Sequence, residues 1–89
     1  MGLELNQFTS IPNTIGMMSE LRILNIDRNN LQGTIPAELD RLRNLKYLNL
    51  VQNPDLRGGL GALCEFNMIS LGADCDRVDC PCCTSCHRY

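Results

Sequence analysis

Residues 21–44 read LRILNIDRNNLQGTIPAELDRLRN, and this stretch decides the fold. Its apolar and turn-forming residues follow the pattern LxxLxLxxNxLxGxIPxxLxxL, which is filled by Leu21, Leu24, Ile26, Asn29, Leu31, Gly33, Ile35, Pro36, Leu39 and Leu42. The central asparagine recurs on both sides, so that Asn6, Asn29 and Asn53 lie 23 and 24 residues apart. A period of this length is typical of repeat architectures, in which each unit is one supersecondary element.

The flanking units are less regular than the central one. The following unit opens with the same leucine spacing, carries one extra residue through Pro54-Asp55, and has Gly61 where proline is expected. The first unit starts late and fits only with one residue deleted. A faint echo at Leu71 and Ala73 predicts a last short strand that ends the sheet. The predicted organisation is three units over about residues 1–20, 21–44 and 45–63, followed by a cap over residues 64–89.

The alternation of leucines within each unit predicts a β-strand, because successive side chains of a strand point to opposite faces. Each unit then adds one parallel strand. An asparagine ladder of Asn6, Asn29 and Asn53 satisfies backbone groups at the turns. Ile35-Pro36 starts a short helical turn on the far side. The predicted fold is an α/β solenoid, with a short parallel sheet on the concave face and irregular or short helical turns on the convex face.

Repeats of this kind bury their apolar faces only by stacking, and about three are needed for stability. Because the first unit is incomplete, we expect upstream repeats of the same protein to be missing. If nothing precedes residue 1, Leu3 and Leu24 should be exposed at the open edge. Periodic leucines could also mark a coiled coil, but no heptad explains why the LxL pair, the asparagine, the glycine and Ile-Pro recur together.

All the cysteines lie beyond the last full repeat. They are Cys64, Cys75, Cys80, Cys82, Cys83 and Cys86. An even number confined to one end predicts a cap closed by three disulfides, and sequence alone leaves about 15 pairings open. A bond between the adjacent Cys82 and Cys83 is disfavoured by disulfide geometry. Cys64, ahead of the others, is expected to tie the last convex segment to the tail.

Two other roles for these cysteines stay open. Short spacing of thiolates and imidazole is typical of zinc ligands, and the candidate set is Cys80, Cys82, Cys83, Cys86 and His87. The Cys83-x-x-Cys86 pair also has the spacing of a redox motif, although no thioredoxin-like strand–helix pattern surrounds it. The disulfide cap is the leading interpretation, and no metal or cofactor is expected.

Two segments resemble known families. NNLQGTIPAEL, residues 29–39, resembles the plant-type, extracellular class of leucine-rich repeat. LGADCDRVDCPCCTSC, residues 71–86, is similar to the C-terminal ends of leucine-rich repeat proteins from diatoms and related algae. The resemblance covers nearly the whole chain. It implies a curved solenoid that recognises proteins, secretion or display at the cell surface, and no catalytic residues.

Composition argues against other classes of function. The net charge is −2, with acids and bases interleaved, so no nucleic-acid site is expected. No apolar run approaches the roughly 18 residues that span a membrane. His87 is the single histidine, and no nucleophile has a base beside it, so we predict no enzyme activity. The acidic residues Asp74, Asp76 and Asp79 lack calcium-loop spacing and are interpreted as solvated turn residues.

A binding surface is predicted from the residues that alternate with the leucines, because these face away from the core. The predicted partner-binding residues are Ile23, Asn25, Asp27, Arg28, Tyr47, Asn49, Val51 and Gln52. The predicted function is therefore a protein-binding module, the C-terminal part of an extracellular leucine-rich repeat recognition or signalling protein, with a protein or peptide ligand. Two alternatives remain, a zinc-binding intracellular adaptor and a purely structural cap with binding done by upstream repeats.

Overall fold

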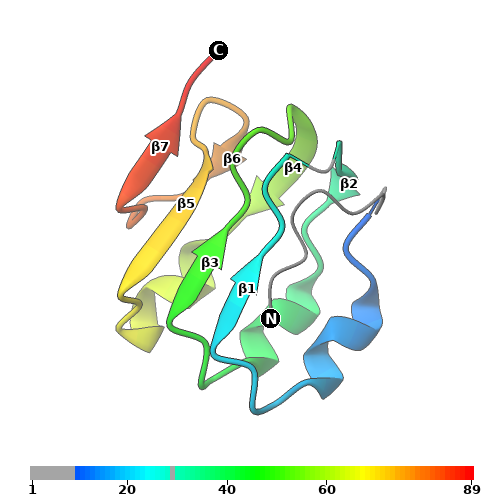
Figure 1. Cartoon of the computed structure of the whole chain (residues 1–89), viewed down its shortest axis with the longest axis vertical. Helices are drawn as coiled ribbons and strands as arrows, with labels where there is room; N and C mark the ends of the chain where they lie inside the picture. Colours follow the sequence, from blue (N-terminus) through cyan, green and yellow to red (C-terminus); the bar gives the residue numbers. More distant parts are fainter. Residues whose placement is uncertain (1–9, 29) are drawn as a thin grey trace.

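The structure is a computed structural model that describes residues 10–28 and 30–89. Groups of short parallel strands are separated by short 3₁₀ helices in this part of the chain (Figure 1). In chain order the elements are η1 (Asn13–Met17), β1 (Ile23–Asn25), β2 (Gln32–Thr34), η2 (Ala37–Arg41), β3 (Tyr47–Asn49), β4 (Asp55–Gly59), η3 (Gly61–Phe66), β5 (Ser70–Asp74), β6 (Val78–Asp79) and β7 (Ser85–His87).

The predicted parallel sheet is confirmed, and within the described residues it has four strands in the order β1-β3-β5-β7. Its register places Leu24 opposite Leu48, and Leu48 opposite Leu71. All three leucines are buried, since paired residues of neighbouring strands point to the same side of the sheet. The leucine period of the sequence thus becomes one apolar row across the sheet.

A second parallel sheet, in the order β2-β4-β6, was not predicted. Its strands carry no apolar alternation, and the side chains of β2 are all exposed. Glycine explains part of its geometry. Gly58 has a φ of 122°, and a Cβ there would stand 3.2 Å from the backbone nitrogen of Ile35. Backbone hydrogen bonds hold these strands together, which leaves little trace in the pattern of side chains.

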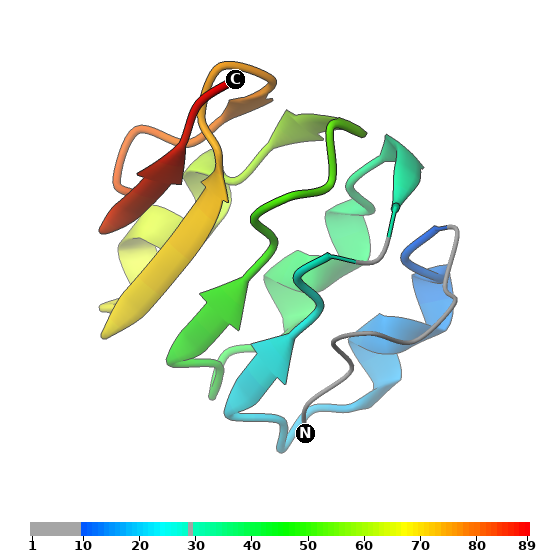
Figure 2. The same ribbon diagram turned by 45° about the horizontal axis from the view of Figure 1, so that its top comes forward.

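The predicted helical turns are confirmed as 3₁₀ helices that lie behind the four-stranded sheet (Figure 2). Proline was predicted to be the first residue of the helical turn. Pro12 and Pro36 are instead the N-cap residues of η1 and η2, one position earlier. Leu39 of η2 and Leu42 after it point into the core. The core fills the space between the two sheets and the helices. Among residues 10–28 and 30–89 its members are Ile11, Ile15, Leu24, Ile26, Leu31, Ile35, Leu39, Leu42, Leu45, Leu48, Leu50, Leu56, Leu60, Leu63, Leu71, Ala73 and Val78.

Two predictions about the ends of the stack are wrong. The strand at Leu71 does not end the sheet, because β7 of the cysteine-rich tail pairs in parallel with β5, and β6 pairs with β4. The cap therefore continues both sheets. Leu24, predicted to be exposed if nothing precedes residue 1, is completely buried.

Candidate protein-binding face and cysteine cap

The outer face of the four-stranded sheet is built in rows. One row runs from Ile23 through Tyr47 to Ser70. The next row runs from Asn25 through Asn49 and Gly72 to Ser85. We call these two rows the strand face. Ser85, at its end, comes from the cap, and its place there follows from β7, which the sequence pattern did not predict.

Ile23 and Tyr47 give the strand face an apolar patch at its β1–β3 side. They lie directly opposite each other on β1 and β3, and their exposed fractions are 47% and 41%. A shallow hollow of about 250 Å³ lies over them, lined by Ile23, Leu24, Asn25, Tyr47, Leu48, Asn49 and Ser70. An exposed pair of large side chains that includes a tyrosine, with polar side chains beside it, is a typical anchor for a partner.

The hollow includes four of the eight predicted partner-binding residues, and the other four lie beyond the ends of the strands. Arg28 and Gln52 are exposed, and both have positive φ values, of 59° and 62°. Arg28 Nε lies 3.4 Å from Asp27 Oδ2, and Asp27 and Val51 are half-buried. The structure therefore separates the predicted set into a hollow on the strands and a rim on the loops that follow them.

The amides of the strand face have different partners. Asn49 Oδ1 accepts a hydrogen bond from the backbone nitrogen of Val51 at 3.2 Å. It also fills space above Gly72, where an added Cβ would stand 3.2 Å from this oxygen. Asn25 Oδ1 is buried without a hydrogen-bond partner among the described residues. A donor from a partner would satisfy this acceptor, because an unpaired buried polar group costs free energy.

Asn53 shows what the predicted ladder does at the turns. It has no exposed surface. Its Oδ1 accepts from the backbone nitrogen of Leu31 at 3.0 Å, and its Nδ2 donates to the carbonyl oxygens of Ile26 and Leu50, each at 2.9 Å. One side chain therefore joins two successive turns of the chain. The other predicted ladder residues, Asn6 and Asn29, lie outside the described residues.

Asp74 was interpreted as a solvated turn residue, and that prediction is wrong. Its exposed fraction is 1%. Its two carboxylate oxygens accept from the backbone nitrogens of Gln52 and Asn53, at 2.7 and 2.8 Å. The carboxylate therefore caps the turn of the preceding repeat. The sequence did not indicate this role, because Asp74 belongs to an acid-rich spacer whose other acids, Asp76 and Asp79, are exposed.

Tyr89 adds a second partner to the same carboxylate. Its hydroxyl donates to Asp74 Oδ2 at 3.3 Å, and the guanidinium carbon of Arg77 lies 4.6 Å from its ring centroid. Loss of solvation raises the pKa of the Tyr89 hydroxyl above its ordinary value of 10.0, and the Asp74 carboxylate raises it further. The tyrosine therefore stays neutral and keeps donating through the physiological range of pH.

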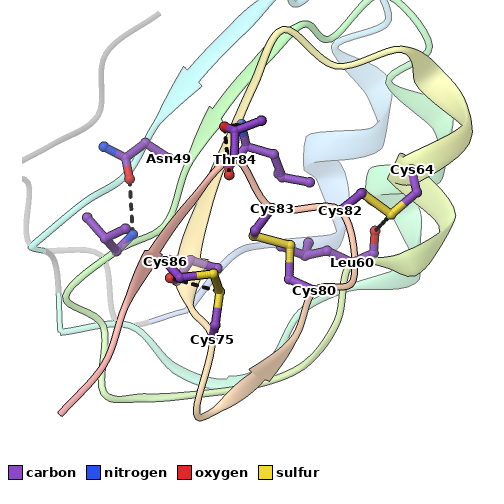
Figure 3. The surroundings of a disulfide bond; sticks show 12 residues. Asn49, Leu60, Cys64, Cys75, Cys80, Cys82, Cys83, Thr84 and Cys86 are labelled. Carbon is purple, nitrogen blue, oxygen red and sulfur yellow. Dashed lines mark hydrogen bonds between the residues drawn. A yellow bond between two sulfur atoms is a disulfide. The ribbon is translucent and has the colours of Figure 1, made fainter.

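The predicted disulfide cap is confirmed by three bonds, Cys64–Cys82, Cys75–Cys86 and Cys80–Cys83 (Figure 3). Cys64 belongs to η3, so its bond ties the convex side to the tail as expected. The sequence-based zinc set is divided by these pairings, since Cys82 is bonded to Cys64. Cys80, Cys82 and Cys83 pack against the core.

These features define a class of protein. The model of the leucine rich repeat family matches residues 1–54, so the chain belongs to this family. Phytosulfokine receptor 1 of Arabidopsis thaliana is 40% identical over 47 residues, which are 53% of this chain and 5% of the receptor. The chain thus spans only a small part of that relative. No solved structure matches the chain. In the described part of the chain, no helix has the length and apolarity to cross a bilayer.

Proposed function

We propose that the chain is a protein-binding module that recognises a protein or peptide through its strand face. The observation that carries the proposal is the exposed pair Ile23 and Tyr47 over a hollow of about 250 Å³. Aromatic anchors in the middle of a polar rim supply most of the binding free energy in typical interfaces. The polar residues that line the hollow beside this pair are Asn25, Asn49 and Ser70. The similarity to a plant receptor supports a ligand that is a peptide or a protein.

The module works outside the cell in this proposal, as the C-terminal part of a recognition or signalling protein. Three disulfides support this location, because such bonds persist in oxidising compartments. We further propose that upstream repeats extend the stack as a curved solenoid. We also propose that the repeat units end at about residues 20, 44 and 63. The cap is proposed to be related to the C-terminal ends of algal leucine-rich repeat proteins.

The test is a selection of peptides on the oxidised 89-residue chain, using a phage-displayed library of random peptides. Affinities of the selected peptides are then measured for Ile23→Ala and Tyr47→Ala. Each change should weaken binding at least about tenfold, which is about 1.4 kcal/mol. Met17→Ala is the matched control, because Met17 is exposed in η1 and lies outside the strand face.

Three outcomes would overturn the proposal. If Met17→Ala weakens the selected peptides as much as Tyr47→Ala does, the binding site is elsewhere. If the library yields no peptide that binds the chain, its role is that of a structural cap, with recognition done by upstream repeats. Equal affinities of the wild type and both face variants would also place the site elsewhere.

A further inference from the structure

The arginines around the strand face differ in whether an acidic side chain pairs with them. Beyond the C-terminal ends of the strands, Arg28 Nε lies 3.4 Å from Asp27 Oδ2, and Arg77 Nε lies 3.9 Å from Asp76 Oδ1. At the opposite end of β1, Arg22 is exposed, and its guanidinium has no ion pair or hydrogen bond within the described part of the chain. Arg22 is therefore a cation that the described residues leave available for a partner.

Arg22 lies beside the hollow of the strand face. It directly precedes Ile23, which lines the hollow together with Tyr47. The carbonyl oxygen of Arg22 accepts from the backbone nitrogens of Lys46 and Tyr47, at 2.9 and 3.1 Å, so the starts of β1 and β3 are joined here (Figure 1). One residue of a strand rises about 3.3 Å, and the side chain of arginine is longer than this. The guanidinium can therefore reach a group that a ligand places at the edge of the hollow.

Lys46, the neighbouring cation, already has a partner. Its Nζ donates to the carbonyl oxygen of Phe66, the last residue of η3, at 2.7 Å. The ammonium adds positive charge to this end of the strand face, but its hydrogen bond directs it toward η3. Glu20 is the acid closest to Arg22 in the sequence, and among the described residues the two form no ion pair. Direct contact with an anionic group of a ligand therefore falls to Arg22.

We propose that the ligand of the strand face is a peptide with an aspartate or glutamate adjacent to the apolar residue that occupies the hollow, and that Arg22 binds this carboxylate. The inference rests on the proposed function, because it concerns the same face. A guanidinium presents a planar fork of donors that matches a carboxylate. Arginine and tyrosine are both enriched among the residues that dominate binding at interfaces. Ile23 and Tyr47 would supply the apolar contact, and Arg22 the specificity for an acidic ligand.

The size of the effect follows from the position of Arg22. An ion pair in open water contributes little, whereas a hydrogen-bonded pair that is fully desolvated loses much more when one partner is removed. Arg22 lies between these cases, since an apolar side chain in the hollow would exclude water from one side of the pair. Neutralising Arg22 should therefore weaken an acidic peptide about tenfold.

The experiment uses the oxidised 89-residue chain and the peptides selected on it from the random phage library. Each peptide is synthesised as selected and with its acid replaced by the matching amide, and affinities are measured by fluorescence anisotropy at low and high salt. We expect the selected peptides to carry an acid beside an apolar residue, and Arg22→Gln to weaken them about tenfold. Their amide versions should bind wild type and Arg22→Gln alike, which also shows that the variant is folded. High salt should weaken only the acidic peptides.

The matched control is Arg41→Gln. Arg41 is an exposed arginine of η2, behind the sheet, and its loss should leave all affinities unchanged. Charge reversal provides a second measurement, since Arg22→Glu should bind a peptide whose acid is replaced by lysine better than it binds the acidic peptide.

Failure of this inference differs from failure of the proposed function. If Arg22→Gln weakens acidic and amide peptides equally, or leaves both unchanged, while Tyr47→Ala still weakens them, the acidic specificity is wrong and the strand face stands. Selected peptides without an acid would contradict the inference in the same way. If no peptide binds, or if Tyr47→Ala has no effect, the proposed function is wrong and this inference is wrong with it.

Discussion

The repeats and the cap build the same backbone arrangement by different means. In the repeats, buried leucines at a regular period and the amide of Asn53 hold successive strands in register. In the cap, β6 and β7 continue both sheets with three disulfides and few leucines. The cap therefore behaves as a last repeat whose apolar contacts have been replaced by covalent bonds.

The side chains at the turns show the same contrast on a smaller scale. Asn53 accepts from one turn and donates to carbonyl oxygens of its own and of the preceding unit. Asp74 only accepts, from Gln52, Asn53 and Tyr89. An amide suits the middle of a stack because it has both donors and an acceptor, whereas a carboxylate has only acceptors. A residue that only accepts suits the place where the stack ends.

The largest effect is expected from Asn53→Ala, which breaks the repeat side of the comparison. It leaves the backbone nitrogen of Leu31 and the carbonyl oxygens of Ile26 and Leu50 without their buried partner. At roughly 1–3 kcal/mol for each unsatisfied group, the free energy of unfolding should fall by about 4 kcal/mol. Denaturant unfolding of the oxidised chain measures this loss.

The matched control for Asn53 is Asn44, an exposed amide whose Nδ2 donates to the carbonyl oxygen of Ser19 at 3.1 Å. Asn44→Ala should change stability by less than about 0.5 kcal/mol, because water replaces the lost bond. Similar losses for the two variants would mean that the buried amide does not join the repeats.

The next effect concerns the cap. Cys64–Cys82 closes a sequence separation of 18 residues and Cys80–Cys83 one of 3. In the chain-entropy model, removing the first with serines should cost about 3 kcal/mol and removing the second about 1.5 kcal/mol. Denaturant unfolding with the other disulfides intact compares the pairs. Equal losses would show that the bonds act through the native state rather than through the unfolded chain.

Prediction from the sequence worked where side chains carry the pattern. The rows of Leu24, Leu48 and Leu71 follow from a period of two, and the clustering of cysteines indicates a cap. The second sheet escaped prediction because its strands carry no row of alternating leucines, and β2, Gln32–Thr34, is exposed throughout. β7 escaped it for a similar reason, since the Ser-Cys-His segment has no leucine to place in a row.

The candidate site was predicted in part for the same physical reason. Ile23, Asn25, Tyr47 and Asn49 line the hollow because the alternation rule extends to the outer face of the strands. The burial of Asp74 depends on contacts with Gln52 and Tyr89, which lie 22 and 15 residues away. The disulfide pairing depends on positions that only the folded chain brings together.

A smaller effect is expected from Asp74→Asn, which gives the turn of the cap the same amide side chain that Asn53 provides in the repeats. The amide has one accepting oxygen, so the backbone nitrogen of either Gln52 or Asn53 would face an NH₂ group instead of an acceptor. Loss of one such bond should lower the free energy of unfolding by about 1.5–3 kcal/mol. Asp76→Asn, at an exposed position, is the control and should cost less than about 0.5 kcal/mol. An undiminished stability in Asp74→Asn would mean that the two turn residues are interchangeable.

The smallest effect is expected on the pKa of Tyr89, whose hydroxyl donates to the Asp74 carboxylate at the end of the stack. Loss of solvation, with the Asp74 carboxylate beside it, raises the pKa of this hydroxyl above 10.0, so the folded state favours the neutral form. The stability gained in this way is present below pH 10 and is lost as the pH rises through the folded pKa. Absorbance titration of phenolate in Tyr47→Phe, where Tyr89 is the remaining tyrosine, should show a midpoint above that of the unfolded chain. Asp74→Asn should lower the midpoint, and Asp79→Asn should not. A midpoint unmoved by Asp74→Asn would mean that the carboxylate and the tyrosine are not coupled.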